Sequence, residues 1–280
     1  MRQLNQAAAA LAMVAVGALS PAPASAHRVA AQAGHVPAGT ADIIGGKPVA
    51  EGTYPWMVRL IIDNHSCGGT LISPDIVLTA QHCVDGFKGT IIADIGKVDW
   101  RTAAAAGQRR TATKVVGGAG LDKGDWAVVR LTTPYQAASY MTLPTDTATD
   151  TVPKFHAIGW GMTKDLGVRQ NLLRHVTLPR VTGSRCGNPP AEICAGDYRK
   201  GGIDTCHGDS GGPLFVTYGR RALQLGITSW GDGCALPKKP GHYTRVSAYL
   251  TRINAAITKL GGTLPPVTAP TPQPSPTPTP

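Results

Sequence analysis

A glycine-rich stretch at residues 201–214 limits what this chain can be more than any other segment does. It reads Gly-Gly-Ile-Asp-Thr-Cys-His-Gly-Asp-Ser-Gly-Gly-Pro-Leu and places Ser210 in a turn, with Gly208 before it and Gly211 and Gly212 after it. Because glycine adopts positive φ and lets the backbone approach a ligand, such a turn can direct several backbone N–H groups at one point. Acyl transfer needs that arrangement beside its nucleophile, since negative charge develops on the carbonyl oxygen under attack.

A serine hydroxyl is a weak nucleophile, so a base must lie elsewhere in the chain. Two other stretches supply partners: Leu-Thr-Ala-Gln-His-Cys, which contains His82, and Gly-Asp-Trp-Ala-Val-Val-Arg-Leu, which contains Asp125. A lone serine in a glycine turn is usually structural, and a lone histidine beside a cysteine is usually a packed side chain. Three such stretches in the order His, Asp, Ser have the order of the chymotrypsin triad.

Together the three stretches resemble the chymotrypsin–trypsin family of serine proteases, from Ile43 to about residue 260. The resemblance implies an all-β fold of two antiparallel six-stranded β-barrels followed by a C-terminal α-helix. It implies that Ser210 attacks the substrate carbonyl and that His82 carries the proton to the leaving amine. Asp125 then holds the imidazole in the right tautomer. Gly208 and Ser210 donate backbone N–H groups to the oxyanion.

Short apolar runs bounded by turn residues fill most of the chain between residues 54 and 246. Such runs are typical of β-strands, and their close spacing favours a sheet or barrel, although spacing alone leaves a β-sandwich open. The 34 glycines favour a turn-rich all-β fold over a helical one. The predicted strands are residues 56–62, 70–72, 76–78, 89–95, 113–116 and 126–131, then, after a connector at 132–144, residues 154–159, 172–181, 213–216, 223–228 and 242–246.

The last predicted element is a helix over residues 246–260. Apolar residues recur there at helical spacing, Ser247 is a candidate N-cap, and the glycine pair at 261–262 marks the stop. Residues 263–280 are almost wholly Pro, Thr, Ser and small residues, which predicts a disordered Pro/Thr-rich tail. The peptidase domain is therefore expected to span residues 43–262.

The N-terminal region has the pattern of a secretory signal. Arg2 supplies a positive end, residues 7–19 form an apolar run too short to span a bilayer well, and residues 24–26 are a small-residue cleavage site. The alternative is a low-complexity alanine helix. We predict a signal peptide at 1–26, a propeptide at 27–42, and a secreted, extracellular protein with no stable membrane insertion.

Residues 43–46, Ile-Ile-Gly-Gly, resemble the mature N-terminus of the family, although an ordinary strand and turn is the alternative. The resemblance implies a zymogen in which the freed α-amino group of Ile43 inserts into the fold and pairs with Asp209, since a buried ammonium needs a charged partner. Residue 42 is Asp, where animal trypsin precursors carry Lys or Arg. Another protease, or a different cut site, must then release Ile43, and this non-basic site resembles bacterial secreted members.

The six cysteines permit full pairing, and export makes disulfides expected. Many connectivities are open from the sequence alone. The chain has no Cys-x-x-Cys pair, so zinc is not expected, and we predict neither a metal nor a cofactor. The resemblance implies the pairs Cys67–Cys83, Cys186–Cys194 and Cys206–Cys234.

The resemblance also implies a specificity pocket. Asp204 lies six residues before Ser210, where trypsin-like members carry the carboxylate at the pocket floor, and Thr205 adds a hydroxyl beside it. A desolvated carboxylate prefers an Arg or Lys side chain. The alternative for Asp204 is a solvated loop carboxylate. The implied pocket walls are Ser229, Trp230, Gly231 and Gly241.

Two positions depart from the family pattern. Gln81 stands where the family usually has alanine, directly before the candidate histidine, and its longer side chain must be packed. Between Cys83 and Asp125 there is no glutamate, whereas animal trypsins bind calcium through glutamates in the corresponding loop. A calcium site in that loop is therefore not expected.

The formal net charge is +10, which indicates either a solvated basic surface or attraction to an acidic partner. No run of five Lys or Arg residues occurs, so a nucleic-acid partner is not expected. We predict a secreted, monomeric serine endopeptidase that hydrolyses peptide bonds after Arg or Lys, with protein or peptide substrates and protein protease inhibitors as partners. The alternatives are the same fold with another pocket preference and a non-catalytic secreted binding protein.

Overall fold

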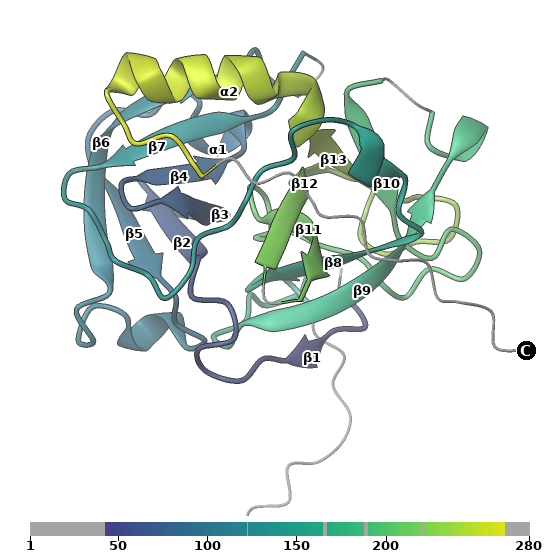
Figure 1. Cartoon of the computed structure of the whole chain (residues 1–280). Coiled ribbons are helices and arrows are strands. Elements are labelled where there is room, and N and C mark those ends of the chain that lie inside the picture. The colour runs from purple at the N-terminus through teal and green to yellow at the C-terminus, as the bar shows by residue number, and fades with distance from the viewer. Residues whose placement is uncertain (1–42, 122, 165–166, 188–189, 220, 267–280) are drawn as a thin grey trace, which may run out of the picture. The chain divides into compact units, whose positions relative to one another are not determined.

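The computed structural model describes residues 43–121, 123–164, 167–187, 190–219 and 221–266 (Figure 1). The predicted signal peptide and propeptide, and the tail beyond residue 266, lie outside the described residues. Within the described ranges the fold is mostly β-sheet, with one long helix at the C-terminal end.

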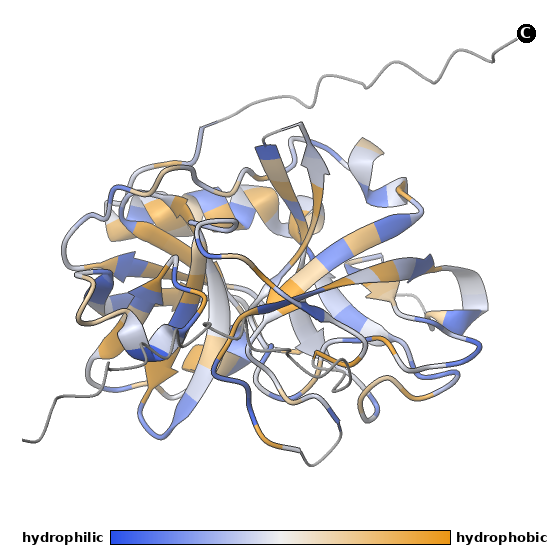
Figure 2. Ribbon diagram, turned by 90° about the horizontal axis from the view of Figure 1, so that it is seen from below, coloured by the Kyte–Doolittle hydropathy of each residue, from blue (hydrophilic) through white to orange (hydrophobic). Residues whose placement is uncertain are grey.

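The first half of the domain forms a closed antiparallel barrel in the order β2-β3-β4-β7-β6-β5. Each strand overlaps one of the predicted apolar runs. Strands β3, β4 and β7 are buried along nearly their whole length, which is why their sequences are apolar runs. Figure 2 shows the alternation of hydrophobic and hydrophilic segments along the ribbon. The strands are β2 (Met57–Ile62), β3 (His65–Ser73), β4 (Ile76–Thr79), β5 (Ile91–Ile95), β6 (Arg109–Gly117) and β7 (Ala127–Leu131).

The second half forms another barrel, which closes because β8 pairs with both β9 and β11. A two-residue strand, β1 (Lys47–Pro48), adds to the outer edge of β9. The expected pair of six-stranded antiparallel barrels is thus confirmed. The strands are β8 (Lys154–Gly159), β9 (Arg174–Val181), β10 (Glu192–Ala195), β11 (Pro213–Tyr218), β12 (Arg221–Trp230) and β13 (Gly241–Arg245).

Strand β10 is absent from the sequence prediction. It has only four residues, so it carries no alternation that a pattern search can detect, and it becomes a strand by pairing with β9 and β13. The shorter helical elements are α1 (Gln81–Val84) and the 3₁₀ turns η1 (Trp100–Thr102), η2 (Ala148–Thr151) and η3 (Gly183–Arg185).

Helix α2 (Val246–Leu260) packs against β6, β7 and β12, and Figure 1 shows it lying across the first barrel. It ends as predicted at Gly261, whose φ of 67° suits a glycine C-cap. The predicted cap at Ser247 is wrong: Ser247 lies inside the helix, and its hydroxyl donates to Asp150 at 2.6 Å. This pair needs two segments far apart in sequence, so no local cap pattern could predict it.

The packed domain continues to residue 266. The backbone N–H of Thr263 donates to the carboxylate of Asp75 at 3.0 Å, and Pro265 is buried. Leu264, Pro265 and Pro266 line a pocket together with Leu143 and Leu250, so the first four residues of the predicted tail lie against the body of the domain.

Three disulfides tie the loops to the barrels: Cys67–Cys83, Cys186–Cys194 and Cys206–Cys234. They are the pairs that the resemblance implies. Cys67–Cys83 fixes α1 to strand β3, and Cys206–Cys234 links the glycine-rich turn to the segment after β12. The two barrels also meet through a buried hydrogen bond, in which Thr70 donates to Gln224 at 2.6 Å.

Candidate active site

His82 and Asp125 lie at the same end of the first barrel's antiparallel β4–β7 ladder, where Thr79 pairs with Ala127. His82 lies on α1 directly after β4, and Asp125 lies two residues before β7. The imidazole Nδ1 of His82 is 2.7 Å from Asp125 Oδ2, and its backbone N–H donates to Oδ1 at 2.9 Å. Two hydrogen bonds between the same residues fix the plane and orientation of the ring.

The carboxylate of Asp125 is fully buried. Ser229 donates its hydroxyl proton to Oδ2 at 2.6 Å, and Thr244 holds the backbone carbonyl of Asp125 at 2.9 Å. Burial raises the pKa of Asp125, but the hydrogen bonds from His82 and Ser229 outweigh it and lower that pKa below its usual value. The carboxylate therefore stays ionised and can stabilise a positive imidazole.

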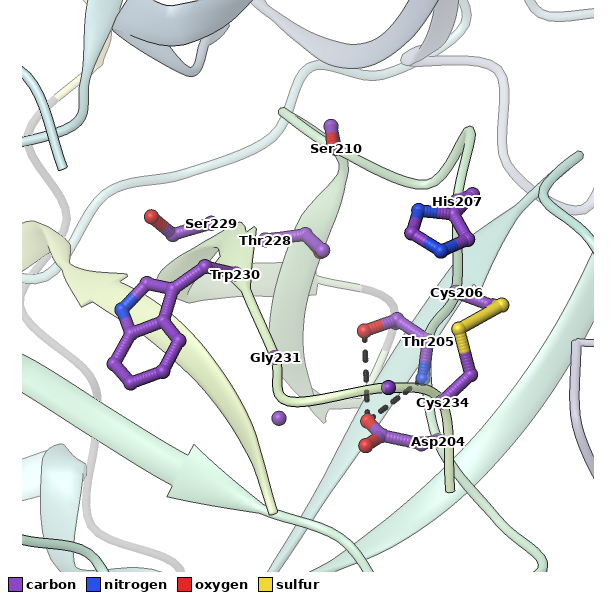
Figure 3. A pocket seen from close by; sticks show the side chains of 12 residues that line it. Asp204, Thr205, Cys206, His207, Ser210, Thr228, Ser229, Trp230, Gly231 and Cys234 are labelled. Carbon is purple, nitrogen blue, oxygen red and sulfur yellow. Dashed lines mark hydrogen bonds between the residues drawn. A yellow bond between two sulfur atoms is a disulfide. The ribbon is translucent and has the colours of Figure 1, made fainter. Parts of the chain in front are cut away.

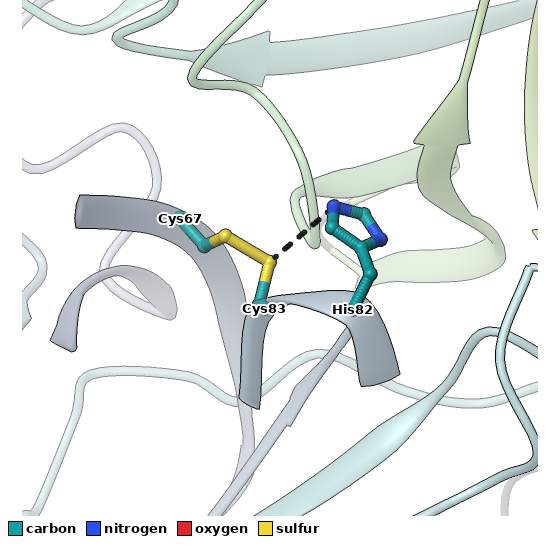
Figure 4. A group of neighbouring side chains, drawn as sticks. All are labelled: Cys67, His82 and Cys83. Carbon is teal, nitrogen blue, oxygen red and sulfur yellow. Dashed lines mark hydrogen bonds between the residues drawn. A yellow bond between two sulfur atoms is a disulfide. The ribbon is translucent and has the colours of Figure 1, made fainter. Parts of the chain in front are cut away.

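The second ring nitrogen of His82, Nε2, lies 3.8 Å from the sulfur of Cys83 (Figure 4). Cys67, His82 and Cys83 are close enough to suggest a metal-ligand set. Both sulfurs belong to the Cys67–Cys83 disulfide, so they offer no thiolate. The disulfide instead lies beside the imidazole.

Gln81 leaves this arrangement intact. Its amide donates to Asp85 at 3.1 Å, on the far end of α1, while the neighbouring backbone N–H of His82 keeps its bond to Asp125. The longer side chain of Gln81 is therefore accommodated by its hydrogen bond to Asp85 and does not disturb the His82–Asp125 pair.

Ser210 lies in the turn before β11, and this turn contacts both barrels. Its carbonyl accepts a hydrogen bond from Gly68 of the first barrel at 2.7 Å, and the next N–H, from Gly211, donates to Thr228 of the second at 2.8 Å. Gly211 has φ of 77°, and a side chain there would collide with Thr79. Only glycine fits at position 211, because the backbone passes close to Thr79 there. The backbone next to Ser210 is therefore fixed in place.

The backbone N–H groups of Gly208 and Ser210 have no acceptor among the described residues. The Ser210 hydroxyl likewise has no hydrogen bond to His82 in the described part of the chain. Such bonds are often long in unliganded enzymes and tighten when substrate binds.

A pocket of about 240 Å³ opens beside Ser210 (Figure 3). In this view Ser210 and Asp204 lie at opposite ends of it. All of the predicted pocket residues line it, namely Asp204, Thr205, Ser229, Trp230, Gly231 and Gly241. The sequence reasoning did not include His207, Thr228 and Gly233, which also line the pocket and adjoin predicted residues in the chain.

Asp204 is only 2% exposed. Its carboxylate accepts hydrogen bonds from the backbone N–H of Thr205 at 2.8 Å and from the hydroxyl of Tyr243 at 3.2 Å. A side chain on Gly241 would come within 2.5 Å of the same oxygen, which explains the glycine. Tyr243 was not predicted, because only the β12–β13 pairing brings it under the pocket.

Burial raises the pKa of Asp204 from 3.8 to about 7. Between pH 3.8 and about 7 the carboxyl of Asp204 is protonated in the native state but ionised in the unfolded chain. The free energy of unfolding therefore falls as pH rises through this range, by on the order of 4 kcal/mol. We expect Asp204→Asn to raise the urea midpoint at pH 8 and to lose this advantage at pH 4. Asp63→Asn, in an exposed turn, is the matched control. Equal midpoints for Asp204→Asn and wild type at both pH values would contradict the assignment.

Asp209 is buried behind the serine. Its carboxylate accepts hydrogen bonds from Gly161 at 2.8 Å and Cys206 at 2.9 Å, and burial raises its pKa to about 6. Ile43 is fully buried within the core of the second barrel. In the intact chain the nitrogen of Ile43 is a peptide nitrogen, so it carries no charge that could pair with Asp209.

A fold of two antiparallel barrels, with a hydrogen-bonded His–Asp pair in one and a serine lining a pocket in the other, is typical of a serine endopeptidase. Its substrates are proteins.

Comparisons with known proteins agree with the geometry. The trypsin family model matches residues 43–253. A trypsin-like protease of Streptomyces glaucescens is 38% identical over 92% of this chain and 94% of its own length. A trypsin of Saccharopolyspora erythraea is 36% identical over 76% of this chain and 99% of its own length. Human serine protease 56 is 33% identical over 74% of this chain and 37% of its own length. The chain belongs to the trypsin family.

Proposed function

We propose that this endopeptidase is secreted as a zymogen and cleaves polypeptides after Arg or Lys. The observation that carries the specificity is Asp204, a buried carboxylate at the end of the pocket away from Ser210. A basic side chain that enters this pocket gives up water and needs a charged partner in return. Two glycines, Gly231 and Gly241, leave the room that a long side chain requires.

Catalysis proceeds by acyl transfer. His82 takes the proton of Ser210 as the hydroxyl attacks the carbonyl carbon, and the tetrahedral intermediate collapses when His82 protonates the leaving amine. Asp125 stabilises the imidazolium through the 2.7 Å hydrogen bond. Water then repeats the sequence on the acyl-enzyme and frees Ser210.

The unpaired N–H groups of Gly208 and Ser210 form the oxyanion hole. Because they have no acceptor among the described residues, they are available when charge develops on the substrate oxygen. One such donor lowers the barrier by roughly 3–4 kcal/mol. The exposed edge of Ser229, Trp230 and Gly231 pairs with an extended substrate backbone.

The experiment that tests this function measures kcat/KM of processed protein on matched Arg, Lys and Phe peptide amides. We expect Arg and Lys to exceed Phe by well over tenfold. A preference for Phe points to another pocket preference, and no hydrolysis of any amide points to a binding protein.

Activation rests on Ile43 and Asp209. Once the chain is cut before Ile43, the new ammonium pairs with the Asp209 carboxylate. Because Asp209 directly precedes Ser210, this ion pair changes the conformation of the serine turn when the chain is cut. We expect protein that begins at Ile43 to be active, and the same protein N-acetylated at Ile43 to lose most of its activity. Acetylation of surface lysines alone is the control. An uncut chain with full activity would contradict the zymogen.

Export is supported by the signal pattern at residues 1–26 and by the pairing of all six cysteines. None of the helices in the described ranges is long and apolar enough to cross a membrane.

A further inference from the structure

A second cavity lies on the other flank of the serine turn. It is smaller than the specificity pocket, at about 40 Å³, and shares no lining residue with it. Gly208 lines it from the serine turn, and Ser66 lines it from β3. Two arginines, Arg59 and Arg169, form its charged wall.

Arg59 is held rigidly. Its guanidinium stacks on the ring of Trp100 at 3.9 Å, and Nη2 donates to the Ser66 hydroxyl at 3.3 Å. Its other terminal nitrogen, Nη1, is buried and has no hydrogen-bond partner among the residues that the structure describes. A buried cationic donor without an acceptor costs free energy, so an anion that reaches this nitrogen and accepts its hydrogen bond would bind favourably.

Arg169 contacts the same hydroxyl, and its Nη1 donates to Ser66 at 3.0 Å. Two guanidinium groups thus share one neutral oxygen. Within the described ranges neither arginine forms an ion pair; the nearby carboxylate of Asp94 is occupied on both oxygens by Arg109, at 2.7 and 2.9 Å. No carboxylate lines the cavity among the described residues; Asp94 attracts Arg59, and the buried Asp209 attracts Arg169, only from outside the lining and without an ion pair.

The cavity is joined to the nucleophile through two backbone contacts. Arg59 of β2 pairs across the ladder with Gly68 of β3, and the N–H of Gly68 holds the carbonyl of Ser210 at 2.7 Å. Gly208, the proposed oxyanion donor, packs against the guanidinium of Arg169. When the substrate carbonyl lies at the N–H groups of Gly208 and Ser210, the residues after the scissile bond can reach this cavity, because Gly208 lines it.

We propose that the cavity binds the carboxylate side chain of a substrate residue that follows the scissile bond, within the first two positions. The protease then prefers cleavage sites in which Arg or Lys is followed by Asp or Glu. The carboxylate replaces the weak contacts to Ser66 with charge-assisted hydrogen bonds from Arg59 and Arg169. This inference rests on the proposed function, because it needs the cut to lie after the residue in the specificity pocket.

The test uses quenched fluorescent peptides that are identical up to the scissile Arg and carry Glu, Gln or Lys at the first or second position after it. We expect kcat/KM to be about tenfold higher for Glu than for Gln at one of these positions, with Lys lowest. The Glu-to-Gln ratio should shrink as sodium chloride is raised toward 1 M. An Arg anilide, which has no residue after the scissile bond, reports the proposed function separately.

Variants assign the preference to the cavity. Arg169→Gln, at an exposed side chain, should bring the Glu-to-Gln ratio close to one, and Arg59→Gln should do the same; thermal melting checks that both fold. Arg252→Gln, on the exposed face of α2, removes the same charge and should keep the wild-type ratio. Equal rates on Glu and Gln peptides by wild-type protein that cleaves the Arg anilide would overturn the inference, as would an unchanged ratio in Arg169→Gln. If the anilide is not cleaved, the proposed function fails and the inference fails with it.

Discussion

Replacing Ser210 by alanine is expected to lower kcat/KM on an Arg amide by roughly 10⁴- to 10⁶-fold. Without the hydroxyl there is no acyl-enzyme, and the residual rate comes from the oxyanion hole and substrate binding alone. His82→Ala should cost about as much, since an unassisted hydroxyl is a weak nucleophile. The double variant should be little worse than either single one, because the two residues act as a unit.

The measurement needs purified, processed protein that begins at Ile43, with melting curves to show that each variant is folded. Ser139→Ala, an exposed serine on the connector between the barrels, is the matched control and should retain wild-type rates. Substantial turnover by Ser210→Ala, free of contaminating protease, would remove Ser210 from the mechanism. Fully additive losses in the double variant would show that His82 acts independently of the serine.

Features that depend on contacts between neighbouring residues could be predicted from the sequence, whereas features that depend on contacts between distant segments could not. The motifs around His82, Asp125 and Ser210 are local, because each needs a particular backbone turn and so leaves glycine or cysteine beside the functional residue. The barrel strands were predictable for the same reason, since a short apolar run bounded by turn residues indicates a buried strand.

Contacts between distant segments were not predictable. The hydroxyl of Ser229 reaches Asp125 across the two barrels at 2.6 Å, although the sequence suggested only a role in lining the pocket. Tyr243 supports Asp204 from β13, and β10 exists only through its neighbours. The cavity between Arg59 and Arg169 has the same origin, because its two arginines are far apart in the chain and only the fold brings them to Ser66.

Replacing Asp204 by serine is expected to remove most activity on Arg and Lys substrates while leaving the triad able to react. With Asp204 present, a charge-assisted hydrogen bond, direct or through one water, replaces the water that the cation loses. With serine there, the cation is left underpaired, and truncating one partner of such a buried pair costs roughly 2–5 kcal/mol. That corresponds to about 30-fold to several thousand-fold in kcat/KM. Phenylmethylsulfonyl fluoride should still label Ser210, since it depends on the triad more than on the pocket charge.

The pH dependence makes this test specific to Asp204. Burial raises the pKa of the Asp204 carboxyl to about 7, and only its ionised form attracts a cation. The wild-type ratio of Arg to Phe hydrolysis should therefore rise as pH increases through about 7, whereas changes in His82 ionisation affect both substrates alike and cancel in the ratio. In Asp204→Ser the ratio should be low and independent of pH, and in Asp204→Glu, which keeps a carboxyl, part of the rise should remain. If wild type prefers Phe, or if Asp204→Ser leaves the Arg-to-Phe ratio and its pH dependence unchanged, Asp204 does not select the substrate and cleavage after basic residues must be abandoned.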